Sequence, residues 1–473
     1  MLPLISWKNV WRNKTRSLVV IIAMMIGVFS GSFIIALATG VIDSRSQDII
    51  SNQTAHIQLH HPKFSDYQEI QYLITDVNES VAKIEALPQV KAVTYKYKNL
   101  VMSHAGSQRG AINLVAINPE KDSAVFAIKN YLKYEGSTYF DSSIRNPILL
   151  SENTAFKHQL ENYLLDSVAF FNLSHSSIPT EVVEKVKKLD GESFKKKKQF
   201  SLKLKEILTE DEYLVHKNRI FKSCAKLKIK RKIELSTYSY TNENIPETYR
   251  VVGYYKTNDA MFDGLNAFVL NDNFANQAQL PANTAHEIDI MLHDKASLDS
   301  VKQKLVTMFP DLLVETYRDV RPEVAMSEDM MDFYTLIIMS IILFALAFGI
   351  INTMLMAVLE RTKEIGMLKA IGMNKKRVFF MIMYETVYLG LTGGVVGMVI
   401  AYFLISYLEV QGINLSMFQE GFEAMGYSSI LYPKLQAEMF FQIVLLVIVT
   451  GILSAIIPAR RALRLNPADA VRF

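Results

Sequence analysis

Features typical of a disulfide-bonded secreted protein are scarce in this chain of 473 residues. Cys224 is its single cysteine, so no disulfide can form within the chain, and we expect the thiol to be inert. The net charge of +4 is small for this length. Because nucleic-acid-binding proteins normally need a concentrated basic face, we expect no nucleic-acid partner.

Catalytic and nucleotide-binding motifs are absent as well. The sequence contains no P-loop (G-x-x-x-x-G-K-[ST]), no G-x-S-x-G elbow, no H-E-x-x-H, no C-x-x-C and no dinucleotide fingerprint. His60 and His61 are adjacent, but no third candidate ligand stands at a suitable spacing, so we expect no metal site. These absences predict a chain that is not an enzyme by itself and that holds no cofactor of its own.

Long apolar runs, in contrast, are abundant: 50% of the residues are hydrophobic and the mean hydropathy is +0.14. A helix of about 20 apolar residues spans the hydrocarbon core of a bilayer, which is about 30 Å thick. The first run, from Ser17 to Thr39, exceeds the roughly 7–15 residues of a signal-peptide core, so we expect a retained anchor. We predict four transmembrane helices, at 17–41, 332–359, 378–408 and 439–457.

Basic residues lie in three segments that alternate with one acidic loop. The basic segments are 1–16, 360–377 and 458–473, whereas the loop 409–438 carries Glu409, Glu420, Glu423 and Glu438 against Lys434 alone. Because Lys and Arg stay on the cytoplasmic side, we expect both termini in the cytoplasm and the residues 42–331 outside. A large outer domain without disulfides favours a bacterial inner membrane with a periplasmic domain. Trp7 and Trp11 favour an amphipathic N-terminal helix on the membrane lipids.

The segment 42–331 reads as a mixed α and β domain. Strand and helix patterns recur at both of its ends, with strands expected at 54–60, 90–97, 286–293 and 312–317 and helices at 76–87 and 297–308. We therefore expect one part assembled from 42–123 and 285–331. The middle, 124–284, is expected to form a second part richer in strands, with the clearest strands at 249–255 and 266–270.

A polar, helix-prone insertion is expected at 161–226 within that middle part. It contains Lys185, Lys187, Lys188 and the run Lys195–Lys198. The simpler interpretation is a solvated helical insertion. The alternative is a docking site for anionic lipid headgroups or for an acidic partner.

Charged residues inside membrane spans usually mark ion or proton pathways, and here Glu385 in the third run stands alone. It lies about two turns from the cytoplasmic end, within reach of bases such as Arg361 or Arg377. We expect it to anchor the third span against the segment that precedes it. A secondary transporter with so few helices and no buried ion pair is not expected.

Two cytoplasmic segments carry recognisable motifs. The first is LERTKEIGMLKAIGMNKK (359–376), in which Ile365, Leu368 and Ile371 share one face of a short helix. Such a helix either serves topology alone or docks into a groove of a partner. The second is IIPARRALRLNPADAVRF (456–473), which closes the fourth span.

These segments closely resemble the FtsX/MacB-like ABC transporter permease family, closest to its lipoprotein-releasing (Lol-type) branch. The first family pattern, E-R-x-x-E-I-G-x-x-[KR]-A-[LI]-G, is met at Glu360, Arg361, Glu364, Ile365, Gly366, Lys369, Ala370, Ile371 and Gly372. The second, P-A-[RK]-x-A-x-x-x-x-P, is met at Pro458, Ala459, Arg460, Ala462 and Pro467. The glycine-rich third span (Gly390, Gly393, Gly394, Gly397) and the N-terminal W-K-N-x-x-R-N-K-x-R are similar too.

The resemblance implies a working unit with other subunits. Two permease subunits, identical or different, would pair, and each would engage a cytoplasmic ATPase that binds ATP and Mg²⁺. The implied coupling helix comprises Glu360, Arg361, Glu364, Ile365, Gly366, Leu368, Lys369 and Gly372, with Glu364, Ile365, Leu368 and Lys369 as the expected contact centre. The four glycines of the third span would form a helix-packing face. The 42–123 and 285–331 part would be the family's porter-like part.

The resemblance also implies mechanotransmission, in which ATPase closure moves the outer domain. The leading substrate is a lipoprotein released from the inner membrane. The alternatives are export of an antibiotic, peptide or other amphiphile with an envelope partner, and a non-transporting regulator of an envelope enzyme. The helical insertion at 161–226 departs from the family's compact outer domain.

Overall fold

The computed structural model describes residues 2–12, 14–106, 108–140, 144–176, 178–435 and 437–464. Pro467, which completes the second family pattern, lies outside the described residues. The chain divides into two compact units. We call 1–46, 323–419 and 428–473 the membrane unit, and 47–322 with 420–427 the large domain.

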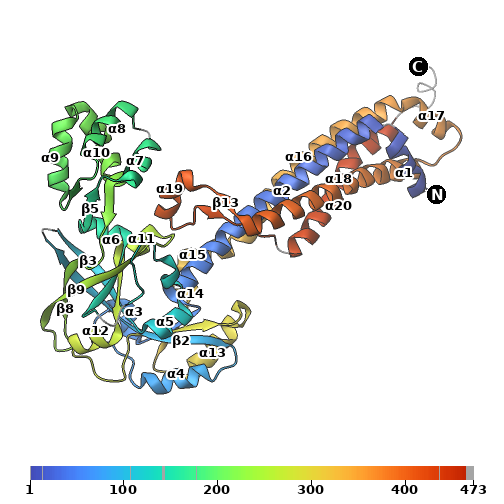
Figure 1. Ribbon diagram of the computed structural model, residues 1–473. Coiled ribbons are helices and arrows are strands. Elements are labelled where there is room, and N and C mark those ends of the chain that lie inside the picture. The colour runs from blue at the N-terminus through green and yellow to red at the C-terminus, as the bar shows by residue number, and fades with distance from the viewer. Residues whose placement is uncertain are drawn as a thin grey trace. The chain divides into compact units, whose positions relative to one another are not determined.

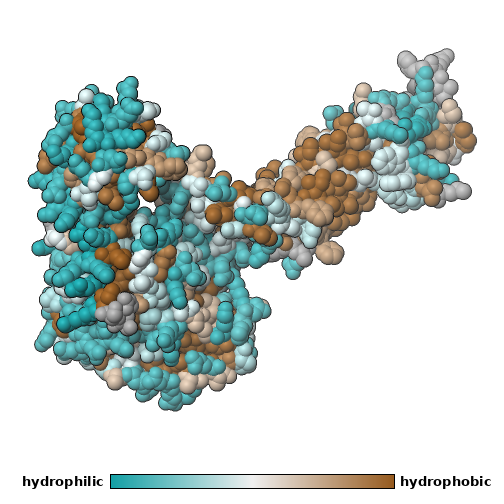
Figure 2. Space-filling view, viewed as in Figure 1, coloured by the Kyte–Doolittle hydropathy of each residue, from teal (hydrophilic) through white to brown (hydrophobic). Residues whose placement is uncertain are grey.

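Four long apolar helices build the membrane unit (Figure 1). They are α2 (Lys14–Ile49), α16 (Met331–Glu360), α18 (Lys375–Gln411) and α20 (Ala437–Leu463), each long and apolar enough to cross a membrane. Figure 2 shows hydrophobic side chains gathered over these helices and hydrophilic ones at the end near α17 (Thr362–Ala370). The predicted fold class, four transmembrane helices with a large α+β domain between the first two, is confirmed.

Each of these helices is longer than the predicted span inside it. The largest difference is at the first span, expected to end at residue 41, where α2 continues to Ile49 and then into a π-helical turn, Ile50–Thr54. The reason is that backbone hydrogen bonds continue a helix beyond the apolar run that hydropathy detects. The short helices α1 (Leu2–Arg12) and α15 (Pro322–Asp329) complete the unit, with a small hairpin of β13 (Ile413–Asn414) and β14 (Ile430–Leu431).

A four-stranded antiparallel sheet is formed by both ends of the large domain. Its order is β12 (Leu313–Thr316), β1 (Ile57–His60), β11 (Glu287–Leu292) and β2 (Val90–Ala105). The predicted helices beside it are confirmed as α4 (Val77–Glu85) and α13 (Leu298–Met308). Three further helices belong to this part: α3 (Pro62–Tyr67), α5 (Pro119–Val125) and α14 (Tyr317–Val320).

The second half of β2 leaves this sheet and joins a closed ring of six strands. The ring runs β2, β3 (Gln108–Ile117), β10 (Asn266–Leu270), β4 (Pro147–Ser151), β9 (Asn244–Tyr255) and β8 (Lys232–Tyr238), and β8 pairs back with β2. Closure removes the exposed strand edges that an open sheet would leave. Helices α6 (Glu152–Lys157), α11 (Ala260–Leu265) and α12 (Asn271–Gln277) accompany the ring. The change between the two parts thus lies within β2, whereas the expected boundary, at 123–124, follows β3.

The insertion forms a small α/β module with its own hydrophobic core. Helices α7 (Ser167–Ser174), α8 (Thr180–Val186), α9 (Lys197–Ile207) and α10 (Glu210–Cys224) gather around a sheet of β6 (Ser193–Phe194), β5 (Glu161–Leu164) and β7 (Ala225–Leu227) (Figure 1). Its core includes Tyr163, Phe200 and Cys224. Burial raises the pKa of the Cys224 thiol to about 12, which agrees with an inert thiol. The helices are as predicted, while the strands are too short to give a sequence pattern.

Part of the loop between the third and fourth spans belongs to the large domain. Residues 420–427, which include most of α19 (Gln419–Ala424), lie in that compact unit. Glu423 pairs with Lys256 at 3.1 Å, and Glu420 pairs with Lys222 of the insertion. The Glu423–Lys256 pair is largely shielded from solvent, whereas the Glu420–Lys222 pair is exposed. The first pair therefore contributes more to the stability of the large domain.

Candidate functional site

The first motif folds as a short helix between two long ones. After α16 ends at Glu360, α17 runs over Thr362–Ala370, and α18 begins at Lys375. The turn between α17 and α18 contains Gly372 at φ +97°, a conformation that favours glycine and lets the chain leave α17 sharply. Asn374 then caps α18 by accepting a hydrogen bond from the Lys376 N–H at 3.1 Å.

Three contacts tie α17 to its own bundle. Ile365 is only 3% exposed and belongs to the apolar core of the membrane unit. Lys369 donates from Nζ to the Leu463 carbonyl at the end of α20, at 3.1 Å. Glu364 accepts a hydrogen bond from Arg12 of α1, which lowers the pKa of the carboxyl group. Since both side chains of that pair are about half exposed, it contributes little stability.

The residues expected at the centre of the ATPase contact are therefore corrected in part, at Ile365. Ile365 was predicted to fill a partner's groove, but it is buried by its own chain because α17 folds back against α16 and α18. Leu368 is half-buried, while Met367 is 56% and Ile371 79% exposed. These two residues are four apart, so they share one helix face. The surface that α17 offers to a partner is thus Met367 and Ile371, which we call the α17 apolar face.

A buried ion pair joins this segment to the third span. Arg361 donates from Nη1 to Glu385 at 2.7 Å and from Nη2 to the Asn9 carbonyl of α1 at 3.2 Å. The expected pairing of Glu385 with a cytoplasmic base is confirmed, with Arg361 as the base. One guanidinium therefore links α1, the α16–α17 corner and α18.

Replacing Glu385 by glutamine is expected to leave most function intact. The amide oxygen can still accept from Arg361, so only the charge contribution is lost, about 1 kcal/mol. Arg361→Leu should cost more, about 3–5 kcal/mol, because it removes the guanidinium that pairs with a buried carboxylate. Thermal unfolding of the purified variants measures both. Complete loss of activity in a stably assembled Glu385→Gln variant would instead assign Glu385 a gating or proton-carrying role.

The glycines of the third span let α18 approach two other helices. A Cβ on Gly393 would lie 2.6 Å from the Ile21 carbonyl oxygen, and one on Gly397 2.5 Å from that of Met25, both on α2. On the neighbouring face, a Cβ on Gly394 would lie 3.1 Å from Val447 of α20, and Gly390 meets Met24 and Val447 at longer distances. The predicted packing face is therefore observed, and Gly393 and Gly397 tolerate no side chain.

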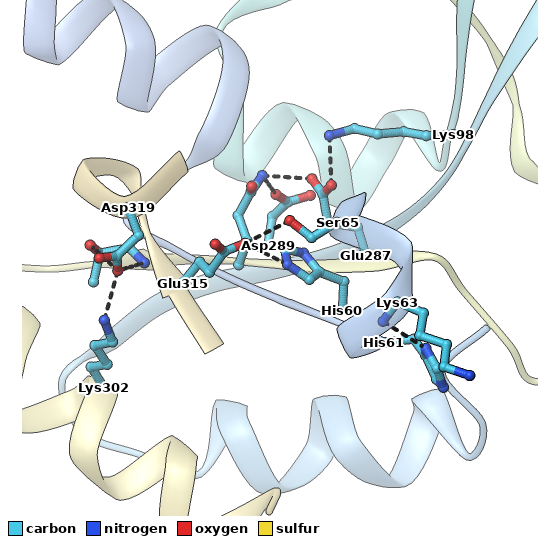
Figure 3. Close-up of polar contacts among 12 residues, drawn as sticks. His60, His61, Lys63, Ser65, Lys98, Glu287, Asp289, Lys302, Glu315 and Asp319 are labelled. Carbon is cyan, nitrogen blue, oxygen red and sulfur yellow. Dashed lines mark hydrogen bonds and ion pairs between the residues drawn. The ribbon is translucent and has the colours of Figure 1, made fainter. Parts of the chain in front are cut away.

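The two adjacent histidines of the large domain serve different contacts. His60 Nε2 lies 2.6 Å from Glu315 Oε2, while His61 Nδ1 accepts from the Lys63 N–H and caps α3. Figure 3 shows His60 directed toward Glu315 and His61 beside Lys63. Within the described residues, no group of three or more potential metal ligands is found.

Beside His60 lies a buried charge cluster on the four-stranded sheet. Lys96 Nζ lies 3.0 Å from both Glu287 Oε1 and Asp289 Oδ2. Lys98 Nζ lies 2.6 Å from Glu287 Oε2 (Figure 3). Gln58 donates to both carboxylates, at 2.6 and 2.8 Å. Burial and the Glu287 charge raise the pKa of Asp289. Burial alone would lower the pKa of Lys96, but the two carboxylates outweigh it and raise that pKa. Sequence patterns missed this cluster because its members come from three strands far apart in the chain.

Comparison with known proteins locates similarity in the C-terminal part of the chain. Residues 336–467, just over a quarter of the chain, match the FtsX-like permease C-terminal family. The ABC transporter permease YtrF of Bacillus subtilis is 33% identical over 129 residues, which cover 27% of this chain and 29% of YtrF. The macrolide export ATP-binding/permease protein MacB of Chlorobium luteolum is 33% identical over 125 residues, covering 26% of this chain and 16% of MacB. The alignments thus span less than a third of these relatives.

Two solved structures also match. The extracellular domain of the ABC-type transporter YknZ from Gram-positive bacteria is 11% identical, covers 55% of this chain and 99% of that chain, and gives a TM-score of 0.28. The periplasmic region of MacB from Actinobacillus actinomycetemcomitans is 10% identical, covers 59% and 95%, and also gives 0.28. The sequence relatives support an FtsX/MacB-like permease family, and they give no support to the lipoprotein-releasing branch in particular.

Proposed function

We propose that this chain, an FtsX/MacB-like ABC transporter permease by its residues 336–467, transmits motion from a cytoplasmic ATPase to the large domain outside the inner membrane. ATP and Mg²⁺ would be bound by the ATPase, a separate subunit. A second permease subunit, identical or different, would complete the membrane part. The observation that carries the proposal is the α17 apolar face. It is exposed, while the rest of α17 is tied to α1, α16, α18 and α20.

The contacts of α17 with several helices would allow it to transmit a force to them. A force on Met367 and Ile371 would reach α1 through Glu364, α20 through Lys369 and α18 through the Arg361–Glu385 pair. Beside that pair, a cavity of about 390 Å³ is lined by methionines 354, 367, 373 and 381 among other side chains. Methionine side chains repack easily, so this cavity leaves α17 room to move against the bundle.

Three chain segments would carry the motion into the large domain. The chain enters that domain in the last turn of α2 and leaves it at the start of α15, and residues 420–427 of the loop between the third and fourth spans belong to it. The Glu423–Lys256 pair holds that loop segment. Movement of α18 and α20 would thereby reach the large domain by a route separate from α2 and α16.

The substrate we propose is an amphiphile taken up on the outer side. Release of lipoproteins from the inner membrane is the first hypothesis, and it rests on the resemblance of the cytoplasmic motifs. Export of an antibiotic is the second, because several similar proteins are named macrolide exporters. A lipoprotein or a small amphiphile copurified with the complex would decide between the two.

The proposal is tested by purifying the affinity-tagged chain from its native membranes in a mild detergent. We expect an ABC ATPase to copurify and ATP turnover in nanodiscs to depend on the ATPase's own catalytic residues. A catalytically inactive ATPase variant is the control for contaminating activity. If no ATPase copurifies and no ATP turnover appears, the proposed function is wrong.

A further inference from the structure

A groove of about 950 Å³ lies between the insertion and the strand ring of the large domain. One wall consists of Lys195–Lys198 at the start of α9, and another of Lys230–Lys232 just before and at the start of β8. Residues 105, 106 and 108 and residues 158–161 complete the lining. The two basic segments are more than thirty residues apart in sequence and meet only in the folded domain.

The charge of this basic groove is not balanced by the protein. Seven of its lining residues are cations, six lysines and Arg231, and Glu161 is the carboxylate among them. In the described part of the chain, none of the seven forms an ion pair; Lys197 lies over the Phe221 ring and Arg231 donates to Asn162. Like charges gathered in a concave surface repel one another and focus a positive potential into the groove. An anionic ligand would relieve the repulsion among these cations.

The start of α9 adds to this potential. The helix begins at Lys197, its N-cap Lys196 makes no side-chain capping bond, and its first turn has no acidic residue. Cations at this end oppose the helix dipole, which favours anions at the first turn. The next helix in the same module, α10, has the ordinary arrangement: a Thr209–Glu212 capping box and acidic residues in the first turn. The first turn of α9, whose Lys197 and Lys198 line the groove, therefore favours an anion there.

Three buried polar atoms of the wall also lack a hydrogen-bond partner within the described chain: His158 Nδ1, Arg231 Nε and Glu161 Oε2. His158 is 2% exposed; its Nε2 lies 2.9 Å from Ser103 Oγ, and its Nδ1 has no hydrogen-bond partner within the described chain. The Nε of Arg231 is likewise buried without an acceptor. Arg231 Nε is a donor, whereas Glu161 Oε2 is an acceptor. His158 Nδ1 is an acceptor too, because Ser103 Oγ donates to the Gly110 carbonyl and therefore accepts from His158 Nε2. A buried donor without a partner costs about 1–3 kcal/mol, and an oxyanion would relieve that cost at Arg231.

We propose that this basic groove binds a ligand that carries two or more clustered phosphate groups. Lysine binds phosphate as a point charge and arginine binds it as a fork, and the seven cations gathered here match the charge of two or more phosphate groups. The volume exceeds what one phosphate ion would fill and suits a headgroup-sized ligand. The same chemistry occurs in a lipid headgroup and in a soluble polyphosphate. The inference is independent of ATPase coupling.

The test uses the full chain in nanodiscs of neutral phosphatidylcholine. Binding of inorganic tripolyphosphate and of a short-chain phosphatidylinositol bisphosphate is measured by isothermal titration, with polyglutamate as the carboxylate probe. We expect saturable binding of at least one phosphate probe, and no comparable binding of polyglutamate. Preference for the lipid probe or for tripolyphosphate identifies the source of the phosphates.

Three double variants separate the effect of the groove from the effect of net charge. Lys195→Gln with Lys198→Gln should weaken binding at least tenfold, and so should Lys230→Gln with Lys232→Gln. Lys187→Gln with Lys188→Gln removes the same charge from exposed positions of the insertion outside the groove, and should change binding less than twofold. Equal effects of all three, tighter binding of polyglutamate, or no binding of either phosphate probe would each overturn the proposal.

Discussion

Replacing Met367 and Ile371 together by aspartate is expected to detach the ATPase from an otherwise intact membrane unit. Both side chains are exposed, at 56% and 79%, so the change should leave the bundle folded and inserted. Interface centres of this kind typically lose about 2 kcal/mol or more per truncated residue, and a charge in an apolar groove costs further desolvation. We expect at least a hundredfold weaker association, since each 1.4 kcal/mol is a factor of ten.

Copurification of the tagged variant with the ATPase, together with ATP turnover in nanodiscs, measures this loss. The matched control is Met417→Asp with Phe418→Asp, two exposed apolar residues of the loop between the third and fourth spans. That control should retain the ATPase. A Met367→Asp, Ile371→Asp variant that binds and couples normally would make α17 merely a positively charged loop segment.

Ile365→Asp would lose the ATPase for a different reason. Ile365 packs in the bundle core, so a carboxylate there damages the membrane unit itself. The spacing of Ile365, Leu368 and Ile371 predicts a shared helix face, but periodicity does not tell whether the protein or a partner covers it. In the structure α17 packs against α1, α16 and α18, so the protein itself covers Ile365. This packing is tertiary, and local sequence periodicity does not reveal it.

The fold was predictable where the signal is local. Apolar runs predict the four membrane helices because a bilayer requires about 20 apolar residues in one stretch. The Glu385–Arg361 pair was within reach of sequence reasoning, since a carboxylate within a span needs a nearby base. The six-stranded ring was not, because β2 exchanges partners halfway and β8 closes the ring over a long sequence separation. The basic groove was predictable only in part. The run Lys195–Lys198 is conspicuous in the sequence, but only the folded domain shows that Lys230–Lys232 lies in the same groove.

Replacing Lys96 by methionine is expected to destabilise the large domain by about 3–5 kcal/mol. Lys96 lies opposite Glu287 in the register of β2 and β11, and its ammonium group contacts both Glu287 and Asp289. All three side chains are at most 5% exposed. Without the lysine, two carboxylates remain buried with one partly exposed cation, Lys98, and removal of one partner from a buried ion pair typically costs that amount.

Thermal unfolding of the full chain in detergent measures this effect on the large domain. For a domain of this size 1 kcal/mol shifts the unfolding temperature by about 2–4 °C, so a fall of roughly 10 °C is expected. Lys98→Met is the matched control: Lys98 contacts Glu287 alone and is partly exposed, so its loss should cost about 1 kcal/mol. Adding Glu287→Gln and Asp289→Asn to Lys96→Met should restore much of the lost stability, because neutral amides need no counter-charge and Gln58 can still donate to their oxygens. If Lys96→Met unfolds at the wild-type temperature, the two carboxylates are protonated or solvated in the native domain, and the ion pairs of Lys96 do not hold the sheet together.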